Sequence, residues 1–261
     1  MVVVLVVVFA AGWAWERWRR PWVLVPALAP QAQADLPRVL VFTKTMKYRH
    51  KSIPDGVLAV QKAGEGRWIT EHTEDAGAFT ADNLKRYAAV VFLSTTGDVL
   101  DTWQQKAFED YIRGGGGYAG VHAAADTEYE WPWYGELVGA WFRDHTSVCE
   151  NAVRVEDAAD ISMRGMPNPW THTDEWYAYR TNPRPNVHVL GSIDDSRTGA
   201  SAMGGDHPIA WKHRVDAGRA WYTGMGHTKE SFVEPVMCGH LQGGIAWAAG
   251  LVKDDGTPTS H

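Results

Sequence analysis

The segment AAVVFLSTTGDVLDTWQQKAFEDYIRGGGGYAGV, residues 88–121, contains the pattern that decides the fold. The apolar run 88–93 predicts a buried strand that ends in a polar turn, and 118–121 predicts a second one. Between them, residues 101–113 carry apolar side chains at the spacing of an amphipathic helix. These side chains are Trp103, Ala107, Phe108, Tyr111 and Ile112. The order strand, helix, strand is typical of parallel strands joined by a helix.

The same alternation occurs on the N-terminal side of this segment. Residues 38–43 and 67–72 predict strands, and 52–63 and 80–84 predict helices. Because these strands are apolar on both faces, we predict an α/β fold whose mostly parallel sheet carries helices on both faces. The second half is less regular. Its predicted elements are strands at 148–155, 187–193, 208–211 and 220–223 and a closing helix at 235–249.

The composition excludes several classes of protein. Of the 261 residues, 45% are hydrophobic and 21% are charged, which is typical of a globular chain and not of a disordered one. The formal net charge of −6 argues against nucleic acid as a partner, because phosphate binding needs a basic surface. Cys149 and Cys238 lie in no metal-ligand spacing, so we assign them no function. The 14 tryptophans suit sugar faces as well as protein cores.

Residues 1–34 form either a signal peptide or a membrane anchor. Val2–Trp15 is almost wholly apolar, a basic cluster follows, and Ala32-Gln33-Ala34 has the form of a signal-peptidase site. The apolar stretch is shorter than the ~20 residues that span a bilayer. We therefore favour an export leader and expect a periplasmic or secreted protein. The other reading is an anchored protein that contacts the membrane through residues 1–34.

Several motifs, in order, resemble the ThuA-like (trehalose utilisation) family. They are GYAGVHAA at 117–124, WPWY at 131–134, LVGA at 137–140 with Phe142 and His145, DEWY at 174–177, PIAW at 208–211, GRAWY at 218–222 and GMGH at 224–227. The likeness covers residues 37–250 and implies a three-layer fold similar to class I glutamine amidotransferases, with a flavodoxin-like core. It also implies, more weakly, a role in carbohydrate metabolism. We expect one ThuA-like domain at 35–251 and a polar tail at 252–261.

The amidotransferase nucleophile elbow has the pattern G-x-C-x-G, a tight turn that exposes a thiol. The corresponding residues here are Gly120-Val121-His122-Ala123-Ala124, so an imidazole occupies the apex. Neither cysteine lies nearby in the sequence. We therefore expect no cysteine-dependent amidotransferase activity.

His122, Glu175 and His227 are the candidate catalytic residues. His122 follows a buried strand, where ligands bind in parallel sheets, and its pKa range suits a general acid or base. Glu175 lies on a predicted strand whose alternation sends Asp174 to the opposite face, so one of the two enters the pocket. His227 follows Gly224-Met225-Gly226 in a loop after a strand. Each has a purely structural alternative. His122 is then a core histidine, Asp174 and Glu175 are a solvated acidic pair, and His227 is a residue at a helix N-terminus.

Six further residues are candidates for substrate binding: Lys44, Tyr48, His50, Trp131, Trp133 and Tyr177. The first three lie in the loop after the first strand and could bind hydroxyls or a carboxylate; the alternative is a solvated basic loop without a binding role. Trp131 and Trp133 offer flat rings for a sugar, although such rings also fill cores.

The sequence predicts no metal site and no cofactor. His145, His172 and His207 form no paired spacing, although a divalent metal site built from dispersed residues stays open. The expected function is that of an enzyme, an isomerase, lyase or hydrolase, which acts on a sugar or keto-sugar derivative by acid–base chemistry. The alternative is a non-catalytic domain that has lost the nucleophile and binds a carbohydrate or a partner protein. The oligomeric state is open.

The leader interpretation predicts that the native protein begins at Asp35, because the first buried strand starts downstream of this residue. N-terminal sequencing of the native protein measures this directly. A start at Met1 in the membrane fraction supports the anchor instead, and a start at Met1 in the cytosol contradicts both readings.

Overall fold

The structure is a computed structural model that describes residues 36–259, so the leader or anchor predicted for 1–34 lies outside the described residues. Within the described part, no helix combines the length and apolar character needed to cross a bilayer.

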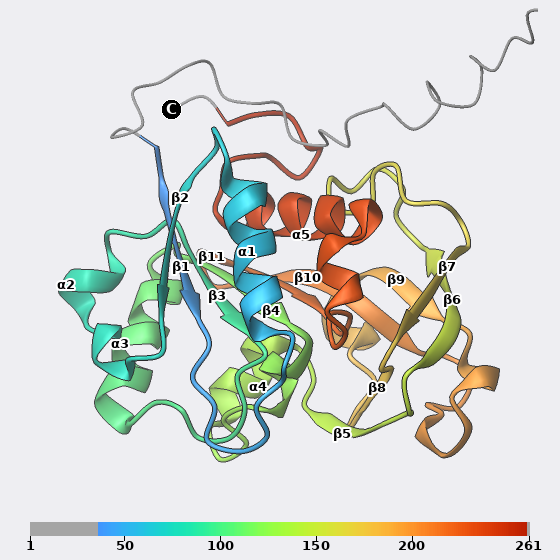
Figure 1. Cartoon of the computed structure of the whole chain (residues 1–261). Coiled ribbons are helices and arrows are strands. Elements are labelled where there is room, and N and C mark those ends of the chain that lie inside the picture. Colours follow the sequence, from blue (N-terminus) through green and yellow to red (C-terminus); the bar gives the residue numbers. More distant parts are fainter. Residues whose placement is uncertain (1–35, 260–261) are drawn as a thin grey trace, which may run out of the picture.

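Within residues 36–259, nine strands form one mixed sheet in the order β2-β1-β3-β4-β11-β10-β9-β6-β7 (Figure 1). The pairs from β2 to β11 are parallel, and the pairs from β11 to β7 are antiparallel. The parallel strands are β1 (Arg38–Phe42), β2 (Ile69–Thr73), β3 (Ala89–Leu93), β4 (Gly117–Val121) and β11 (Gly218–Thr223). The antiparallel strands are β10 (Pro208–Val215), β9 (His188–Ile193), β6 (Cys149–Val155) and β7 (Trp170–Asp174). A separate small sheet pairs β5 (Phe142–His145) with β8 (Tyr177–Tyr179).

Helices cover both faces of the sheet and make three layers (Figure 1). One core cluster joins α1 (Ile53–Gly64) and α5 (Pro235–Ala248) to the sheet, and the other joins α2 (Ala81–Leu84), α3 (Thr102–Arg113) and α4 (Pro132–Val138) to it. Strand β1 shows how the sequence achieves this. Val39 and Val41 pack in the first cluster, whereas Leu40 and Phe42 pack in the second, because successive side chains of a strand alternate between faces. The predicted α/β fold is therefore confirmed.

Two local predictions were wrong, and two short elements were not predicted. Trp103 is 85% exposed, although the helical pattern placed it inward. It lies about 140° around α3 from Phe108, which with Ile112 forms the buried stripe. The strand expected around Glu175 is interrupted there, because β7 ends at Asp174 and β8 begins at Tyr177. Helix α4 and strand β5 are short and follow no local pattern that predicts them.

The described part of the predicted polar tail, residues 252–259, folds back on itself and onto Leu251. Val252 pairs with Pro258, and the Thr259 amide donates to the Leu251 carbonyl. Cys149 and Cys238 are both free.

The core predicts a contrast between two leucines on neighbouring helices. Leu241 of α5 is fully buried, whereas Leu58 of α1 is 54% exposed. We expect Leu241→Ala to reduce the free energy of unfolding by about 2–5 kcal/mol, because it leaves a cavity in the core. The matched change Leu58→Ala is expected to alter it by about 0.5 kcal/mol or less. Urea denaturation measures both, and equal losses would contradict the assignment of the α5 face.

Candidate functional site

Four residues from four separate segments converge at one edge of the sheet: His50, His122, Glu175 and His227. One donor atom from each lies within 4.8 Å of those of the other three. The histidines follow β1, β4 and β11, which are parallel strands, so their carboxyl ends meet at the same edge. Glu175 joins them from the connection between β7 and β8. We call these four residues the histidine cluster.

His122 occupies a sharp turn directly after β4. Its backbone has a φ of 51°, the left-handed region that non-glycine residues rarely adopt, and its side chain is fully buried. His122 Nδ1 lies 2.9 Å from the Gly224 carbonyl oxygen. Because a carbonyl only accepts, Nδ1 carries a proton, and in the neutral ring Nε2 keeps a free lone pair. Nε2 faces the rest of the cluster.

The backbone around His227 is held by the buried carboxylate of Asp174. Asp174 accepts hydrogen bonds from the backbone amides of Gly226 (2.7 Å), His227 (3.0 Å) and Thr228 (3.3 Å). Gly226 has a φ of 111°, which favours glycine at this position. The two acidic neighbours thus have different roles, since Asp174 orders the loop and Glu175 enters the cluster.

Glu175 is the carboxylate around which the histidines gather. Its Oε2 lies 3.1 Å from His227 Nδ1 and 3.5 Å from His122 Nε2, and its Oε1 lies 3.0 Å from His145 Nδ1. Burial opposes ionisation, but the bonds and charges of His122 and His227 outweigh it and hold the pKa of the Glu175 carboxyl below its usual range. Burial likewise opposes the charge of His227, yet Glu175 raises the pKa of this imidazole.

His50 completes the cluster from the loop after β1. It is 5% exposed, and its ring packs edge-on against those of His122 and His227, at centroid distances of 4.8 and 5.2 Å. Its Nδ1 is buried without a hydrogen-bond partner. Burial, and then the neighbouring His122 and His227, lower the pKa of His50 to about 3, so this ring is neutral at physiological pH.

His145 is a site residue that sequence reasoning ranked low. Strand pairing sets His145 of β5 opposite Tyr177 of β8, and its side chain is 48% exposed. His145 Nδ1 lies 2.8 Å from the Thr146 carbonyl oxygen and 3.0 Å from Glu175 Oε1. Both oxygens accept, so Nδ1 carries the proton and Nε2 of the neutral ring stays free. The available signal was its place within the family-like motif at 137–145, because no sequence spacing pairs it with Glu175.

The model of the trehalose utilisation family ThuA matches residues 38–248. The chain belongs to the ThuA family. No curated protein is significantly similar to it. Among solved structures, this ThuA-family chain is similar to a putative ThuA-like protein from Bacteroides uniformis, with a TM-score of 0.70 and 22% identity over 88% of this chain and 98% of that one.

Two further structures are similar to the ThuA-family chain. A putative ThuA-like protein from Parabacteroides merdae gives a TM-score of 0.68 and 19% identity over 87% of this chain and 92% of that one. A β-galactosidase from Halorubrum lacusprofundi gives 0.51 and 17% over 87% of this chain but 33% of that one. At these identities the likeness shows a shared fold.

Two of the predicted binding residues lie against the histidine cluster of this ThuA-family protein. The Tyr177 ring packs on His122 with centroids 4.2 Å apart, and it is buried. Tyr48 packs edge-on against His50 at 4.8 Å and is 60% exposed, so it lies at the rim.

The remaining predicted binding residues are engaged elsewhere. The Lys44 ammonium donates to the Val99 carbonyl at 2.9 Å. Trp131 and Trp133 lie at the start of α4 and pack on each other, with centroids 5.0 Å apart. Trp133 belongs to the second core cluster, and Trp131 packs against it. For these two tryptophans, the core reading fits better than a platform beside the cluster.

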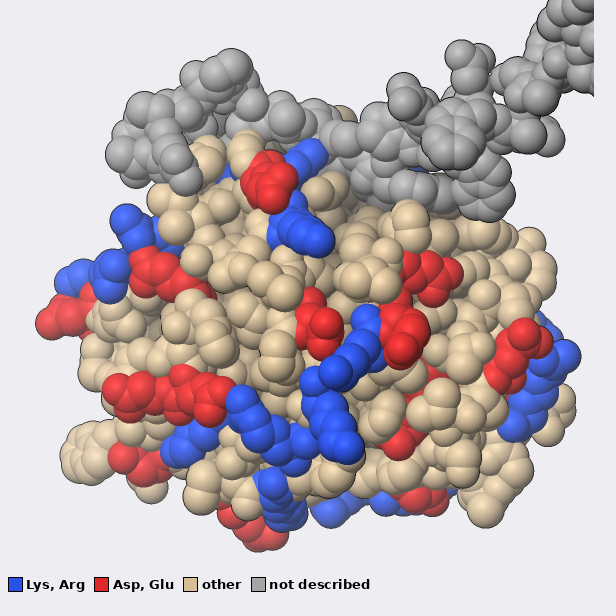
Figure 2. All heavy atoms as spheres, in the orientation of Figure 1, with Lys and Arg blue, Asp and Glu red and all other residues tan. Residues whose placement is uncertain are grey.

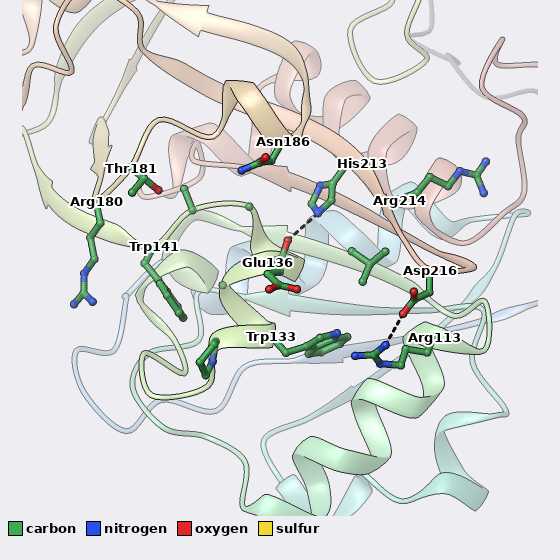
Figure 3. Close-up of a pocket in the computed structure, with 15 residues that line it drawn as sticks. Arg113, Trp133, Glu136, Trp141, Arg180, Thr181, Asn186, His213, Arg214 and Asp216 are labelled. Carbon is green, nitrogen blue, oxygen red and sulfur yellow. Dashed lines mark hydrogen bonds and ion pairs between the residues drawn. The ribbon is translucent and has the colours of Figure 1, made fainter.

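Trp133 also lines a groove of about 860 Å³ that none of the histidine-cluster residues line (Figure 3). Its other walls include Glu136, Trp141, Arg180 and Asn186. His213 closes one side by hydrogen bonding to the Glu136 carbonyl oxygen at 2.9 Å.

The role of Asp174 predicts a large effect from a minimal change. Asp174→Asn keeps the shape but replaces one acceptor oxygen by an amide group that donates, so at least one backbone amide of residues 226–228 loses its partner. We expect the free energy of unfolding at neutral pH to fall by about 2–4 kcal/mol. The matched Asp110→Asn, at an exposed α3 residue paired with Lys106, is expected to change it by about 0.5 kcal/mol or less. Urea denaturation compares them, and similar small losses would contradict this role.

Proposed function

We propose that this ThuA-family protein acts in carbohydrate metabolism on a sugar or keto-sugar derivative by acid–base chemistry of histidine and glutamate. The observation that supports it is the position of Glu175, whose two carboxylate oxygens contact His122, His227 and His145 at the ligand-binding edge of the sheet. A carboxylate that orients an imidazole fixes its tautomer and supports proton transfer by its other nitrogen.

Burial assigns different parts to the three imidazoles. The His122 side chain is fully buried, whereas those of His227 and His145 are 22% and 48% exposed. A substrate therefore reaches His227 and His145, whereas the buried His122 acts through its contact with Glu175. His145 Nε2, free of a proton in the neutral ring, is suited to remove a proton next to a keto-sugar carbonyl. Isomerisation and elimination both begin with this step.

The distribution of surface charge argues against a polyanionic partner, and the position of the cysteines argues against a thiol nucleophile. Figure 2 shows basic and acidic side chains interspersed on the face in view, which suits neither a polyanion nor nucleic acid. Cys149 and Cys238 lie outside the histidine cluster. Burial raises the pKa of the Cys238 thiol, which disfavours the reactive thiolate.

The expected place of action is outside the cytoplasm. This part of the proposal rests on the leader-like sequence of residues 1–34, with a membrane-anchored form as its alternative.

Purified protein incubated with a panel of keto-glucosides and followed by NMR tests the proposal. We expect turnover by the wild type. Glu175→Gln is expected to lower the turnover rate ~100-fold or more, because it removes the carboxylate that orients the imidazoles. Glu230→Gln, a change at an exposed glutamate outside the cluster, serves as the control and is expected to keep full activity. Absence of turnover across a broad panel, with and without added divalent metal, would overturn the catalytic proposal.

The groove in Figure 3 favours a second candidate function, carbohydrate binding without catalysis. Trp141 supplies a partly exposed flat ring, and Glu136, Arg180 and Asn186 supply hydrogen-bonding groups. Calorimetry with the same sugars separates the two candidates. Loss of binding in Trp141→Ala but not in His122→Ala would support the groove, and the reverse would support the cluster.

A further inference from the structure

We propose that His50, His122, Glu175 and His227 bind one divalent transition-metal ion, with zinc as the first candidate. This inference rests on the function proposed above in so far as it places the ion at the same site. The binding itself depends on the geometry of these four residues alone.

The donor atoms have the spacing that a single ion requires. Ligands bound at ~2.0–2.1 Å with tetrahedral angles lie about 3.4 Å apart. Three separations in the cluster match this value. His122 Nε2 lies 3.2 Å from His227 Nδ1, and Glu175 Oε2 lies 3.5 Å from His122 Nε2 and 3.1 Å from His227 Nδ1. A ring nitrogen of His50 is within 4.8 Å of all three donors.

The neighbouring groups are those that orient metal ligands. A ligating histidine usually donates its other ring N–H to a carbonyl or carboxylate. His122 does so through Nδ1 to the Gly224 carbonyl, which leaves Nε2 as the donor facing the site. Glu175 presents Oε2 to the cluster while its Oε1 is held by His145 Nδ1. Asp174 fixes the backbone of His227 through the amides of residues 226–228.

Hydrogen bonding within the cluster does not explain why the His50 imidazole is buried there. Its imidazole is 95% removed from solvent and its Nδ1 has no partner, and such an unsatisfied buried group costs free energy. The ring instead lies edge-on against His122 and His227, which are themselves bound to Glu175. A bound cation explains why three imidazoles and one carboxylate are packed together in a nearly water-free place.

The donor set selects the class of ion. Three imidazole nitrogens and one carboxylate oxygen suit zinc and its first-row neighbours better than magnesium or calcium, which prefer oxygen ligands. His227 is the partly exposed member of the four, so solvent approaches the ion from that side. An ion held there would supply Lewis-acid polarisation of a substrate carbonyl that approaches from that side. His145, which is no ligand, then remains as the exposed base.

The test is metal binding by the whole chain after treatment with a chelator. We expect the wild type to take up one equivalent of Zn²⁺ by elemental analysis and calorimetry, with a rise in Tm. Co²⁺ in its place is expected to give the visible absorption of a low-coordinate site. His50→Ala and Glu175→Gln are each expected to lower the affinity at least about tenfold. His188→Ala, at an exposed histidine that pairs with Asp157, is the matched control and is expected to bind as the wild type does.

His227→Ala, a change at a partly exposed position, gives the same information if the buried His50 variant fails to fold. Zinc uptake that survives both Glu175→Gln and His227→Ala shows binding elsewhere and overturns the proposal, as does the absence of uptake by the wild type. The two proposals fail separately. If metal-free protein turns over a keto-sugar, the acid–base function stands and the ion is not required for it. If the protein binds one zinc ion but turns over no keto-sugar, the metal site stands and the catalytic proposal fails.

Discussion

The carboxylate of Asp174 connects the end of β7, the antiparallel edge strand, to the loop after β11, and the candidate site depends on that connection. The parallel half supplies His50, His122 and His227, whereas Glu175 follows the last strand of the antiparallel half. Asp174 ends that strand and accepts the backbone amides of residues 226–228 from the loop after β11. A buried carboxylate is costly unless its lone pairs are satisfied, so this arrangement holds only when both halves are in place.

The histidine cluster is an expensive feature that stability alone does not explain. Its imidazoles and the Glu175 carboxylate are largely withdrawn from water, one ring nitrogen has no partner, and His122 has a backbone conformation that is rare outside glycine. Cores of similar volume form at less cost from apolar residues. Groups arranged against local rules in this way are typical of functional sites.

The strand-to-turn geometry at residues 120–124 is compatible with more than one chemistry. The sharp turn after β4 presents its central side chain, the imidazole of His122, at the edge of the sheet. The fold thus fixes where the group lies, but the side chains around it decide what it does. Glu175 and His145, on which the proposals for this site rest, come from outside this turn.

The sequence by itself determined the α/β layering and the general position of the site. Strands such as β1 and β3 are apolar on both faces, so a helix-covered parallel sheet follows from local pattern alone, and His50, His122 and His227 were recognisable because each follows such a strand. The approach of Glu175 to these histidines, the contact of His145 with that carboxylate, and the packing of Trp131 and Trp133 into the core were decided by the tertiary structure. These contacts join residues far apart in the chain across antiparallel strands and short elements with weak local signals. The spacing of residues along the chain therefore does not predict these contacts. Only the assembled sheet brings the donor atoms of the histidine cluster within 4.8 Å of one another.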